Sequence, residues 1–452
     1  MNIEILDTQS TIVAPATAAG GAVMMIRLSG NRAIEIADKL FRGRQTLCDA
    51  EGYTLHYGEL IDSDGEFLDD VVVALFRAPR SYTGDDTVEF TIHGSEYIAS
   101  RLMQLAIEHG ARMATAGEFT RRAFLAGKLD LSRAEAVADI IASDSKWSHR
   151  VAAKQMRGDY AQLLSSLREE LLRLCSLLEL ELDFSEEDVE FANRDTLSEM
   201  LGKIEYQLKK LISSFALGNA IKDGVLVAIV GEPNVGKSTL LNRLVEEQRA
   251  IVSDIAGTTR DTIEATRTID GIRYRFIDTA GIHSTHNELE QMGIERTHKA
   301  IDMAHIVLHV ASAEYPVFER INISEEQHYV RLINKVDKID IASQHSDEPY
   351  LYISAKEGYG IDELISKLRT IISTPSYGGD DVYVTNIRHY DALRQALSAL
   401  HDAEQSLRHN APSDLLSEDL RQVLHHLGEI TGEITSDDDI LHSIFSKFCI
   451  GK

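Results

Sequence analysis

The chain has 452 residues, a hydrophobic fraction of 44% and a formal net charge of −26 at pH 7. Its length predicts about three domains, and it contains no run of about 18 apolar residues that would cross a membrane. The strong acidity excludes a protein that coats nucleic acid by itself, so any RNA contact needs a local basic patch or a partner's surface.

The cysteines and the opening residues indicate the cellular compartment. Cys48, Cys175 and Cys449 are too few and too scattered for a disulfide framework or a zinc site. The first residues, MNIEILDTQST, lack the basic and then apolar pattern of a signal peptide. We therefore expect a cytoplasmic protein with reduced thiols.

The first 120 residues read as a mixture of strands and helices. Apolar runs at 22–30 and 69–76 predict strands, and the spacing of apolar residues at 31–40 predicts a helix. The stretch 78–94 begins with Pro, Gly and Asp and then alternates, which is typical of a loop that enters a strand.

A long helix follows this first part. Apolar residues recur at spacings of three and four residues, which gives one buried helix face, and they are Leu163, Leu167, Leu171, Leu174 and Leu178. The stretch 181–190 holds six carboxylates, which indicates a solvated acidic end.

Residues 225–375 change in character. Short apolar strands at 225–230, 305–310 and 329–334 alternate with helical stretches, which predicts a mostly parallel sheet covered by helices. Helical patterns return after residue 380, so the α/β block is expected to be inserted into a helical domain. The predicted fold class is α/β plus α, with an N-terminal α+β domain, a helical bundle and an inserted P-loop domain. The predicted boundaries are 1–120, 121–222, 223–378 and 379–452.

The stretch GEPNVGKST (231–239) fits the P-loop pattern, and it stands between a predicted strand and a predicted helix. Gly231 and Gly236 allow the backbone to curl so that its N–H groups face phosphate oxygens. Lys237 adds a positive charge at the β and γ phosphates, and Ser238 offers a hydroxyl to Mg²⁺.

Three further motifs follow in order, each at the end of a predicted strand. They are DTAG (278–281), NKVD (334–337) and SAK (354–356). Asp278 suits Mg²⁺ through water, Asp337 suits the N1–H and N2–H donors of guanine, and the Ala355 N–H suits guanine O6. Ligands bind at the carboxyl ends of strands in open α/β sheets, so the four motifs together predict a GTPase domain.

The hydrolysis machinery departs from the common pattern. Ile282 and His283 follow DTAG where a water-positioning glutamine usually stands. Thr258 or Thr259 is expected to be the switch threonine on Mg²⁺. Asn234, with backbone carbonyls of the 253–258 loop, is expected to bind K⁺ and so to supply the charge of an arginine finger. The alternative for Asn234 is a hydrogen bond that shapes the loop.

The predicted ligands of nucleotide and metals are as follows. GTP contacts are expected from Asn234, Val235, Gly236, Lys237, Ser238, Thr239, Ser253, Asp254, Ile255, Ala256, Gly257, Thr258, Thr259, Asp278, Thr279, Ala280, Gly281, Asn334, Lys335, Asp337, Ser354, Ala355 and Lys356. Metal ligands are expected to be Ser238 and Thr259 for Mg²⁺, and Asn234, Ser253, Ile255 and Thr258 for K⁺.

Several stretches together resemble one family, MnmE (also called TrmE), the GTPases that modify the wobble uridine of tRNA. They are APRSYTGDDTVEFTIHG (78–94), AGEFTRRAFLAGKLDLSRAEAVADII (116–141), the GTPase motifs and the closing FCIGK (448–452). The GTPase motifs are shared with many proteins, whereas the N-terminal stretches and the tail make the resemblance specific.

The resemblance implies an N-terminal domain that binds tetrahydrofolate and dimerises, a helical domain, and an inserted GTPase domain. It also implies that K⁺ and contact with a second GTPase domain stimulate GTP hydrolysis. It implies a flavoprotein partner, MnmG, which forms a heterotetramer with this chain and which itself binds FAD and NADH. Together the two would add an aminomethyl or carboxymethylaminomethyl group to C5 of U34, with the one-carbon unit from a tetrahydrofolate.

The resemblance also implies particular residues. The folate contacts correspond to Arg27, Glu89, Lys128 and Lys452, and the catalytic glutamate corresponds to Glu290. Carboxylates of folate suit Arg and Lys, and the N–H pair of a pterin suits a carboxylate. The alternatives are ordinary surface pairing for Arg27 and Lys128, and a helix ion pair or solvated charge for Glu290.

Cys449 is expected to line the same site, either as a thiolate that attacks C6 of the uridine or as a residue needed for shape. The alternative is a buried packing cysteine on a final helix. We do not expect a prenylation signal, because Lys452 stands where that signal needs Ser, Met, Gln, Ala, Leu or Phe.

The chain departs from the family at a few positions. Ala116 stands where proline is usual, and His283 stands where arginine is common. One rival interpretation is a regulatory GTPase of ribosome assembly, of the Era or Der type. Such proteins carry a second GTPase domain or a basic KH module with a GXXG loop, and neither is found in the sequence. A further alternative is a scaffold whose GTP switch only moves a partner.

Overall fold

The computed structural model describes residues 10–183, 194–246, 264–278, 300–324, 327–339, 349–372, 382–409, 411–433, 441, 444–446 and 448–451. Its contacts divide the chain into two units. Unit 1 comprises Met1–Ala138, Gln155–Leu180 and Leu420–Lys452, and unit 2 comprises Asp139–Lys154 and Glu181–Asp419.

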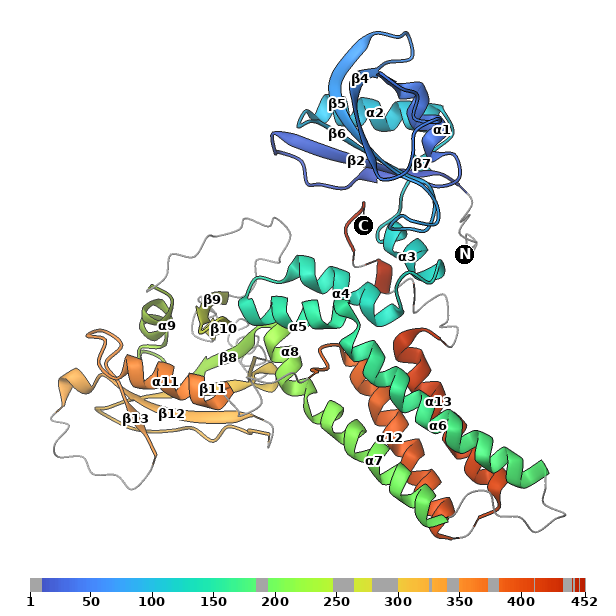
Figure 1. Ribbon diagram of the computed structural model, residues 1–452. Coiled ribbons are helices and arrows are strands. Elements are labelled where there is room, and N and C mark those ends of the chain that lie inside the picture. The colour runs from blue at the N-terminus through green and yellow to red at the C-terminus, as the bar shows by residue number, and fades with distance from the viewer. Residues whose placement is uncertain are drawn as a thin grey trace, which may run out of the picture. The chain divides into compact units, whose positions relative to one another are not determined.

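Unit 1 contains a seven-stranded sheet in the order β3-β4-β5-β6-β2-β1-β7 (Figure 1). Neighbouring strands are antiparallel except for the parallel pair β1 and β7. The strands are β1 Ile12–Pro15, β2 Val23–Ser29, β3 Phe41–Gly43, β4 Thr54–Ile61, β5 Phe67–Phe76, β6 Thr87–His93 and β7 Arg112–Met113. The strands predicted at 22–30 and 69–76 are therefore present as β2 and β5.

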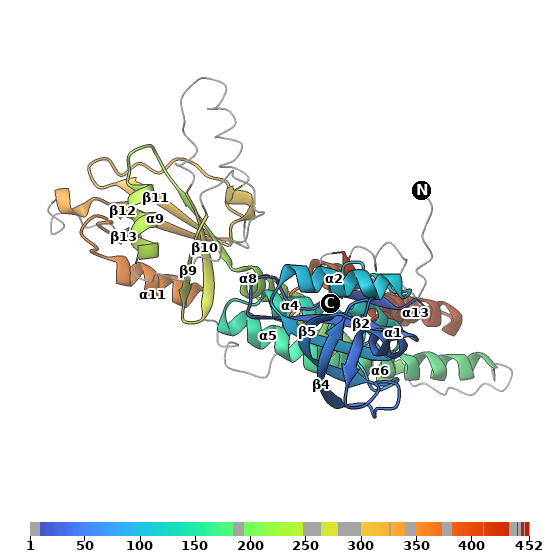
Figure 2. The same ribbon diagram turned by 90° about the horizontal axis from the view of Figure 1, so that it is seen from above.

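Two helices, α1 (Ala33–Leu40) and α2 (Glu96–Glu108), pack on one face of this sheet (Figure 2). Alternate residues of β2 and β6, including Ile26, Leu28 and Phe90, are fully buried beneath them. Apolar residues alternate along the strands and recur at helical spacing in α1, so each element has one apolar face. These faces pack together to form the core. The N-terminal part of unit 1, from β1 to β7, is thus α+β, as the sequence predicts.

A buried carboxylate fixes the start of α3 (Glu118–Leu125). Glu118 is 1% exposed and accepts two hydrogen bonds from Arg112, at 2.6 and 2.9 Å, and one from Arg122 at 3.0 Å. Burial alone would raise the pKa of Glu118, but Arg112, the Thr115 N–H and Arg122 outweigh it and lower that pKa. The network ties α3 to strand β7, next to the loop that meets the C-terminal tail.

Six further helices among the described residues lie outside the two sheets and their covering helices. They are α4 Leu131–Ala142, α5 Lys146–Arg157, α6 Asp159–Asp183, α7 Arg194–Ser213, α12 Ile387–Arg408 and α13 Ser413–Thr431. None of the helices in the described ranges is both long and apolar enough to cross a membrane. The predicted leucine face of α6 is correct from Leu167 onward, but Leu164 is buried in place of the half-buried Leu163. Leu164 lies three residues before Leu167, which the 3.6-residue repeat allows equally well.

Unit 2 contains a six-stranded sheet in the order β13-β12-β11-β8-β10-β9, parallel except for the antiparallel pair β9 and β10. The strands are β8 Val225–Val230, β9 Glu264–Ile269, β10 Ile272–Asp278, β11 Ile306–Ser312, β12 His328–Asn334 and β13 Leu351–Tyr352. The sheet's helices are α8 Phe215–Asp223, α9 Lys237–Glu246 and α11 Ile361–Ile372. This is the predicted mostly parallel GTPase sheet.

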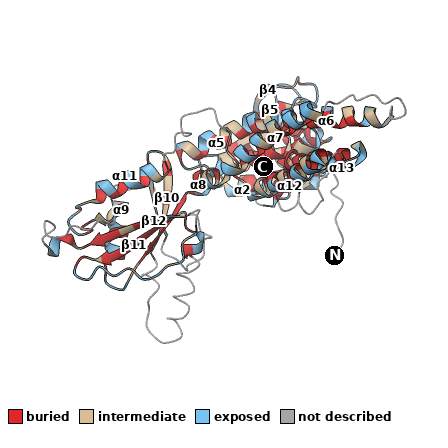
Figure 3. Cartoon of the chain, turned by 90° about the horizontal axis from the view of Figure 1, so that it is seen from below, coloured by how far each residue is buried: buried red, intermediate tan, exposed pale blue. Residues whose placement is uncertain are grey.

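The central strands of this sheet are buried on both faces (Figure 3). Val225, Val227 and Ile229 of β8 pack into one core with α9 and α11, whereas Ala228 and Val230 pack into a second core on the opposite face. Burial on both faces explains why β8 and β11 read as continuous apolar runs. The predicted motifs follow the carboxyl ends of strands in this sheet.

Candidate nucleotide site and candidate folate site

The loop between β8 and α9 has the tight geometry that a P-loop needs. Gly236 has φ +99°, and a Cβ there would stand 2.4 Å from Asn334 Nδ2, so any side chain would displace Asn334. Asn234 also lies in the left-handed region, at φ +64°, which asparagine tolerates better than most residues. The loop ends at the N-terminus of α9, where free backbone N–H groups favour an anion.

Lys237, the first residue of α9, is buried and folded back on its own loop. Its Nζ donates to the carbonyl of Gly231 at 2.6 Å and to that of Glu232 at 2.8 Å. The ammonium group therefore lies at the P-loop, where the sequence predicts the β and γ phosphates of GTP. Ser238 and Thr239 are exposed in the first turn of the same helix, and the Mg²⁺ ligand that the sequence predicts at Ser238 stays a prediction.

Asn334, at the end of β12, connects two of the predicted motifs. Its Nδ2 donates to the Val235 carbonyl at 2.8 Å, and its Oδ1 accepts from the Ala355 N–H at 2.9 Å. The side chain is buried, so both halves of its amide are used inside the protein. Asn334 therefore holds the P-loop and the SAK loop together.

Asp337 lies exposed beside this junction and fits the guanine contact that its motif predicts. Its Oδ1 accepts from Ser354 Oγ at 2.5 Å, and this hydrogen bond, followed by weaker attractions to Lys356 and Lys338, lowers the pKa of Asp337. Lys335 has φ +67° and reaches across to donate to the Asn234 carbonyl at 2.5 Å. Residues of the NKVD and SAK motifs thus form one cluster above the P-loop.

The candidate folate site lies in unit 1, where two paired strands present an ion pair. Arg27 of β2 and Glu89 of β6 are register partners, and Arg27 Nε donates to Glu89 Oε1 at 2.8 Å. The guanidinium also lies 5.6 Å from the Tyr82 ring and 5.5 Å from the Phe119 ring. The structure therefore brings together two residues that are 62 positions apart in the sequence.

The C-terminal tail reaches this ion pair. Arg27 Nη1 donates to the Gly451 carbonyl at 3.3 Å, and Ile450 forms an isolated antiparallel bridge with Ala116. Gly451 has φ +100°, and a Cβ there would lie 1.9 Å from the Pro15 carbonyl oxygen, so only glycine fits at this position. The tail is thus held beside Arg27 by this hydrogen bond and by the bridge between Ile450 and Ala116.

Aromatic and aliphatic residues anchor the segment before the tail. Leu441, Ile444, Phe445 and Phe448 pack against Leu131 and Ala134 of α4, with Phe124 of α3 beside them. Ile444 and Phe445 are helical, but Phe448 and Cys449 lie beyond the helix. Cys449 is exposed, so the alternative of a buried packing cysteine is wrong.

Comparison with known proteins decides the family. The model of the GTP-binding protein TrmE N-terminus matches residues 11–128, and that of the MnmE helical domain matches residues 131–449. The tRNA modification GTPase MnmE of Bacteroides fragilis (strain YCH46) is 48% identical over 98% of this chain and 100% of that protein, and its counterpart in Flavobacterium johnsoniae is 48% identical over 98% and 99%.

The chain belongs to the MnmE (TrmE) family of tRNA modification GTPases. Among solved structures, Era from Aquifex aeolicus is 29% identical and covers 38% of this chain and 65% of that one. Its TM-score of 0.26 is too low to support a conclusion about the fold.

Some of the residues predicted for this family's sites lie outside the described residues. They are Ser253, Asp254, Ile255, Ala256, Gly257, Thr258, Thr259, Thr279, Ala280, Gly281, Glu290 and Lys452. Asp278 is described only as the last residue of β10, in register with Ile229 of β8. Lys128 is exposed and donates to the Pro79 carbonyl at 2.5 Å, and its part in a folate site stays a prediction.

Sequence reasoning missed Arg243 of α9, whose guanidinium forms hydrogen bonds with the backbone of the SAK loop. Its Nε donates to the Ala355 carbonyl at 3.2 Å, and its Nη2 donates to the Lys356 carbonyl at 2.5 Å. The only available signal was a basic residue two turns into α9. Helical spacing places such a residue on a face, but it does not show which loop that face meets.

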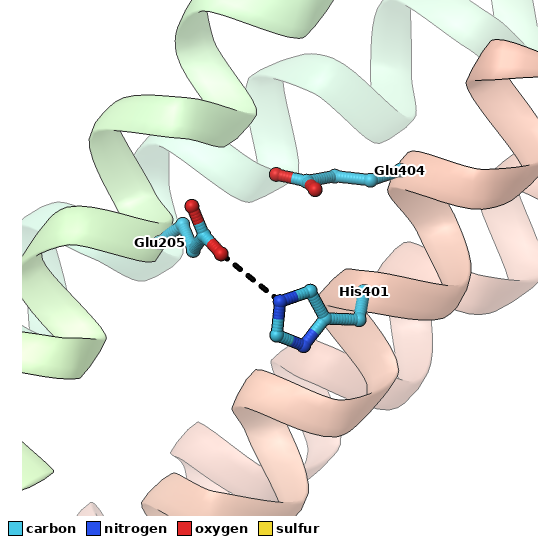
Figure 4. Close-up of side chains that lie close together, drawn as sticks. All are labelled: Glu205, His401 and Glu404. Carbon is cyan, nitrogen blue, oxygen red and sulfur yellow. Dashed lines mark hydrogen bonds and ion pairs between the residues drawn. The ribbon is translucent and has the colours of Figure 1, made fainter.

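A further group of possible metal ligands lies between α7 and α12 (Figure 4). Atoms of Glu205, His401 and Glu404 lie within 4.8 Å of one another, and His401 Nε2 is 3.0 Å from Glu205 Oε1. Lys209 donates to Glu205 at 2.6 Å, which is the main reason for the lowered pKa of that carboxyl, and Arg408 donates to Glu404 at 3.3 Å. Both carboxylates already have cationic partners, so we interpret this group as an ion-paired contact between helices.

Proposed function

We propose that the chain is a GTP-hydrolysing enzyme that works with the flavoprotein MnmG to add an aminomethyl or carboxymethylaminomethyl group to C5 of U34 in tRNA. The one-carbon unit comes from a tetrahydrofolate bound in unit 1. The observation that carries this proposal is the meeting of Arg27, its partner Glu89 and the Gly451 carbonyl in a chain that also has a P-loop.

The residues around Arg27 fit a folate in charge and shape. Arg27 suits a folate carboxylate, Glu89 suits the N–H pair of the pterin, and the rings of Tyr82 and Phe119 border the same guanidinium. Burial raises the pKa of Tyr82, whose hydroxyl lies 2.9 Å from Thr120 Oγ1, so this phenol stays neutral beside the ligand. Lys128 and Lys452 would complete the site.

Cys449 is placed for one of two roles at this site. As a thiolate it would add to C6 of the uridine, so that C5 attacks the one-carbon group, and it would leave again when C5 loses its proton. Otherwise it would shape the pocket for the uridine. Burial raises the pKa of Cys175 to about 11 and also raises that of Cys48, so neither of those thiols is suited to act as the nucleophile.

The remaining partners follow the same proposal. The chain forms a homodimer, Mg²⁺ and K⁺ act at the GTPase site, and FAD and NADH belong to MnmG. Asn234 is exposed at the P-loop and would hold K⁺, while Ser238 would hold Mg²⁺. Glu290 would act on the attacking water. The partner carries part of the RNA surface, which is consistent with the net charge of −26.

The test of the folate site is equilibrium binding of a tetrahydrofolate to the purified chain alone. We expect Arg27→Met to weaken binding by about 10–100-fold, because a hydrogen bond to a charged group contributes about 1.5–3 kcal/mol. Arg32→Met is the matched control, since Arg32 pairs with Glu35 on the surface of α1. A wild-type chain that binds no tetrahydrofolate would favour the regulatory GTPase instead.

Base recognition has its own test. Asp337→Asn is expected to exchange the preference for guanine for a preference for xanthine, because an amide oxygen and N–H replace two acceptor oxygens. Ser354, which donates to Asp337, stays able to donate to the amide oxygen of the variant. Competition between GTP and XTP in a binding assay measures the exchange. Unchanged binding of GTP by the variant would show that Asp337 does not read the base.

A further inference from the structure

Helix α5 (Lys146–Arg157) has a mostly basic outward face, beside which Met156 is also exposed. Its sequence KWSHRVAAKQMR contains four Lys or Arg residues and no acidic residue. We name as the α5 stripe the five residues Lys146, His149, Arg150, Lys154 and Arg157. Spacings of three and four residues place them on one side of the helix. Lys154 is half-buried and the other four are exposed, whereas the opposite side, with Ser148, Val151, Ala152 and Gln155, is buried.

Two neighbouring acidic residues form ion pairs with cations outside the stripe. Asp144, just before the helix, forms an ion pair with Arg273 of β10, and Asp139 of α4 forms one with Lys222 of α8 at 2.8 Å. Arg150 lies over the Trp147 ring at 5.3 Å. The stripe is therefore a local concentration of positive charge in a chain whose net charge is −26.

The start of the helix is fixed to the GTPase sheet. The Trp147 N–H donates to the Gly271 carbonyl at 3.3 Å, in the turn between β9 and β10. A Cβ at Gly271 would lie 3.2 Å from Lys146 Cβ and 3.4 Å from Trp147 Cδ1, so the turn and the helix are in close contact. Strand β10 continues from this turn to Asp278 of the DTAG motif. The first turn of α5 is consequently in contact with the sheet that carries the DTAG motif.

Plain solvation does not account for such a face. Lys146, Arg150 and Lys154 stand four residues apart, and like charges at this spacing destabilise a helix. A face that only kept an acidic chain in solution would carry carboxylates, as residues 181–190 do. A membrane-binding helix would need a free apolar face, whereas the apolar face of α5 is buried in the fold.

We propose that the α5 stripe binds the phosphate backbone of the substrate tRNA. This inference rests on the proposed function, which makes tRNA the substrate. Successive cations at one-turn intervals, about 6 Å apart along the helix axis, suit a row of phosphates. Such contacts position an RNA without reading its sequence, so they would orient the tRNA rather than select it.

The test compares two triple variants of the full chain by anisotropy of a labelled tRNA over a series of KCl concentrations. The stripe variant is Lys146→Glu/Arg150→Glu/Lys154→Glu. The control variant reverses three exposed charges of unit 2 that lie on other elements, Lys203→Glu/Arg320→Glu/Lys367→Glu. Both variants change the net charge equally, so the comparison separates a local surface from overall charge.

We expect the stripe variant to bind tRNA at least about 10-fold more weakly than the control, and the slope of log K against log salt to fall by about 2. GTP hydrolysis without tRNA should equal that of the control, which also reports a folded GTPase domain. The triple Lys146→Gln/Arg150→Gln/Lys154→Gln should lose about half as much affinity on a logarithmic scale.

Equal tRNA affinity and equal salt slope in the stripe variant and the control would overturn the proposal. Loss of MnmG binding with unchanged tRNA binding would also overturn it and would assign the stripe to the protein partner. If the wild-type chain modifies U34 while the stripe variant still binds tRNA normally, the stripe proposal fails and the proposed function stands. If the wild-type chain neither binds tRNA nor modifies U34, both fail.

Discussion

Exchange of K⁺ for Na⁺ at equal ionic strength is expected to slow GTP hydrolysis by about 10³-fold. That is the lower end of what an arginine finger contributes to phosphoryl transfer. Asn234 carries this expectation, because it is exposed at the P-loop next to the place of the phosphates and the usual glutamine after DTAG is replaced by Ile282. Stopped-flow release of phosphate in the two salts measures the effect.

Variants at Asn234 separate ion binding from loop shape. Asn234 has φ +64°, so Asn234→Ala removes the oxygen ligand but also strains the backbone. Asn234→Gly removes the ligand without that strain, and Asn234→Asp keeps an oxygen. We expect Asn234→Ala and Asn234→Gly to lose the preference for K⁺ to the same extent, and Asn234→Asp to keep it. Equal rates of the wild-type chain in both salts would contradict the K⁺ role.

Cys449→Ser is expected to abolish U34 modification, or reduce it severely, while GTP hydrolysis by the purified chain stays near normal. Serine keeps the size of the side chain and loses the thiolate, so the substitution tests chemistry more than packing. Cys449 is exposed, and two residues further on the Gly451 carbonyl accepts from Arg27. Mass analysis of nucleosides from tRNA incubated with each variant measures the loss.

Cys48→Ser is the matched control, since Cys48 is an exposed cysteine of the same unit and lies far from the tail in the sequence. It should leave modification unchanged. Normal modification of U34 by Cys449→Ser would contradict a chemical role and leave only a lining role for the side chain.

Motifs and periodicity predicted the GTPase sheet and its loops well. The P-loop, NKVD and SAK stretches each follow a strand, and the strand ends bring them together through Asn334, whose side chain bonds to both neighbouring loops. Such patterns are local in sequence, so they can be recognised without knowledge of tertiary contacts. Arg243 shows the limit, because its two carbonyl acceptors lie more than 100 residues away.

The candidate folate site depended on the resemblance rather than on patterns in the residues. Nothing local in the sequence indicates that Arg27 pairs with Glu89 or that both lie beside Gly451, since these contacts span 62 and 424 positions. The ion pair between the buried Glu118 and Arg112 was also missed, although the two are near in sequence, because they lie on different elements. Long-range pairing is fixed by strand register and packing, which a single sequence does not display.

The central claim is that one chain couples a GTPase site to U34 modification at the folate site. Its most direct test is mass spectrometry of U34 from unmodified tRNA incubated with the chain, MnmG with FAD and NADH, GTP, Mg²⁺, K⁺, a tetrahydrofolate one-carbon donor, and either ammonium or glycine as the amine donor. The account predicts an aminomethyl or carboxymethylaminomethyl group on U34 that disappears when either GTP or the tetrahydrofolate is left out. Unmodified U34 in the complete mixture, with GTP hydrolysed at the full rate, would contradict it.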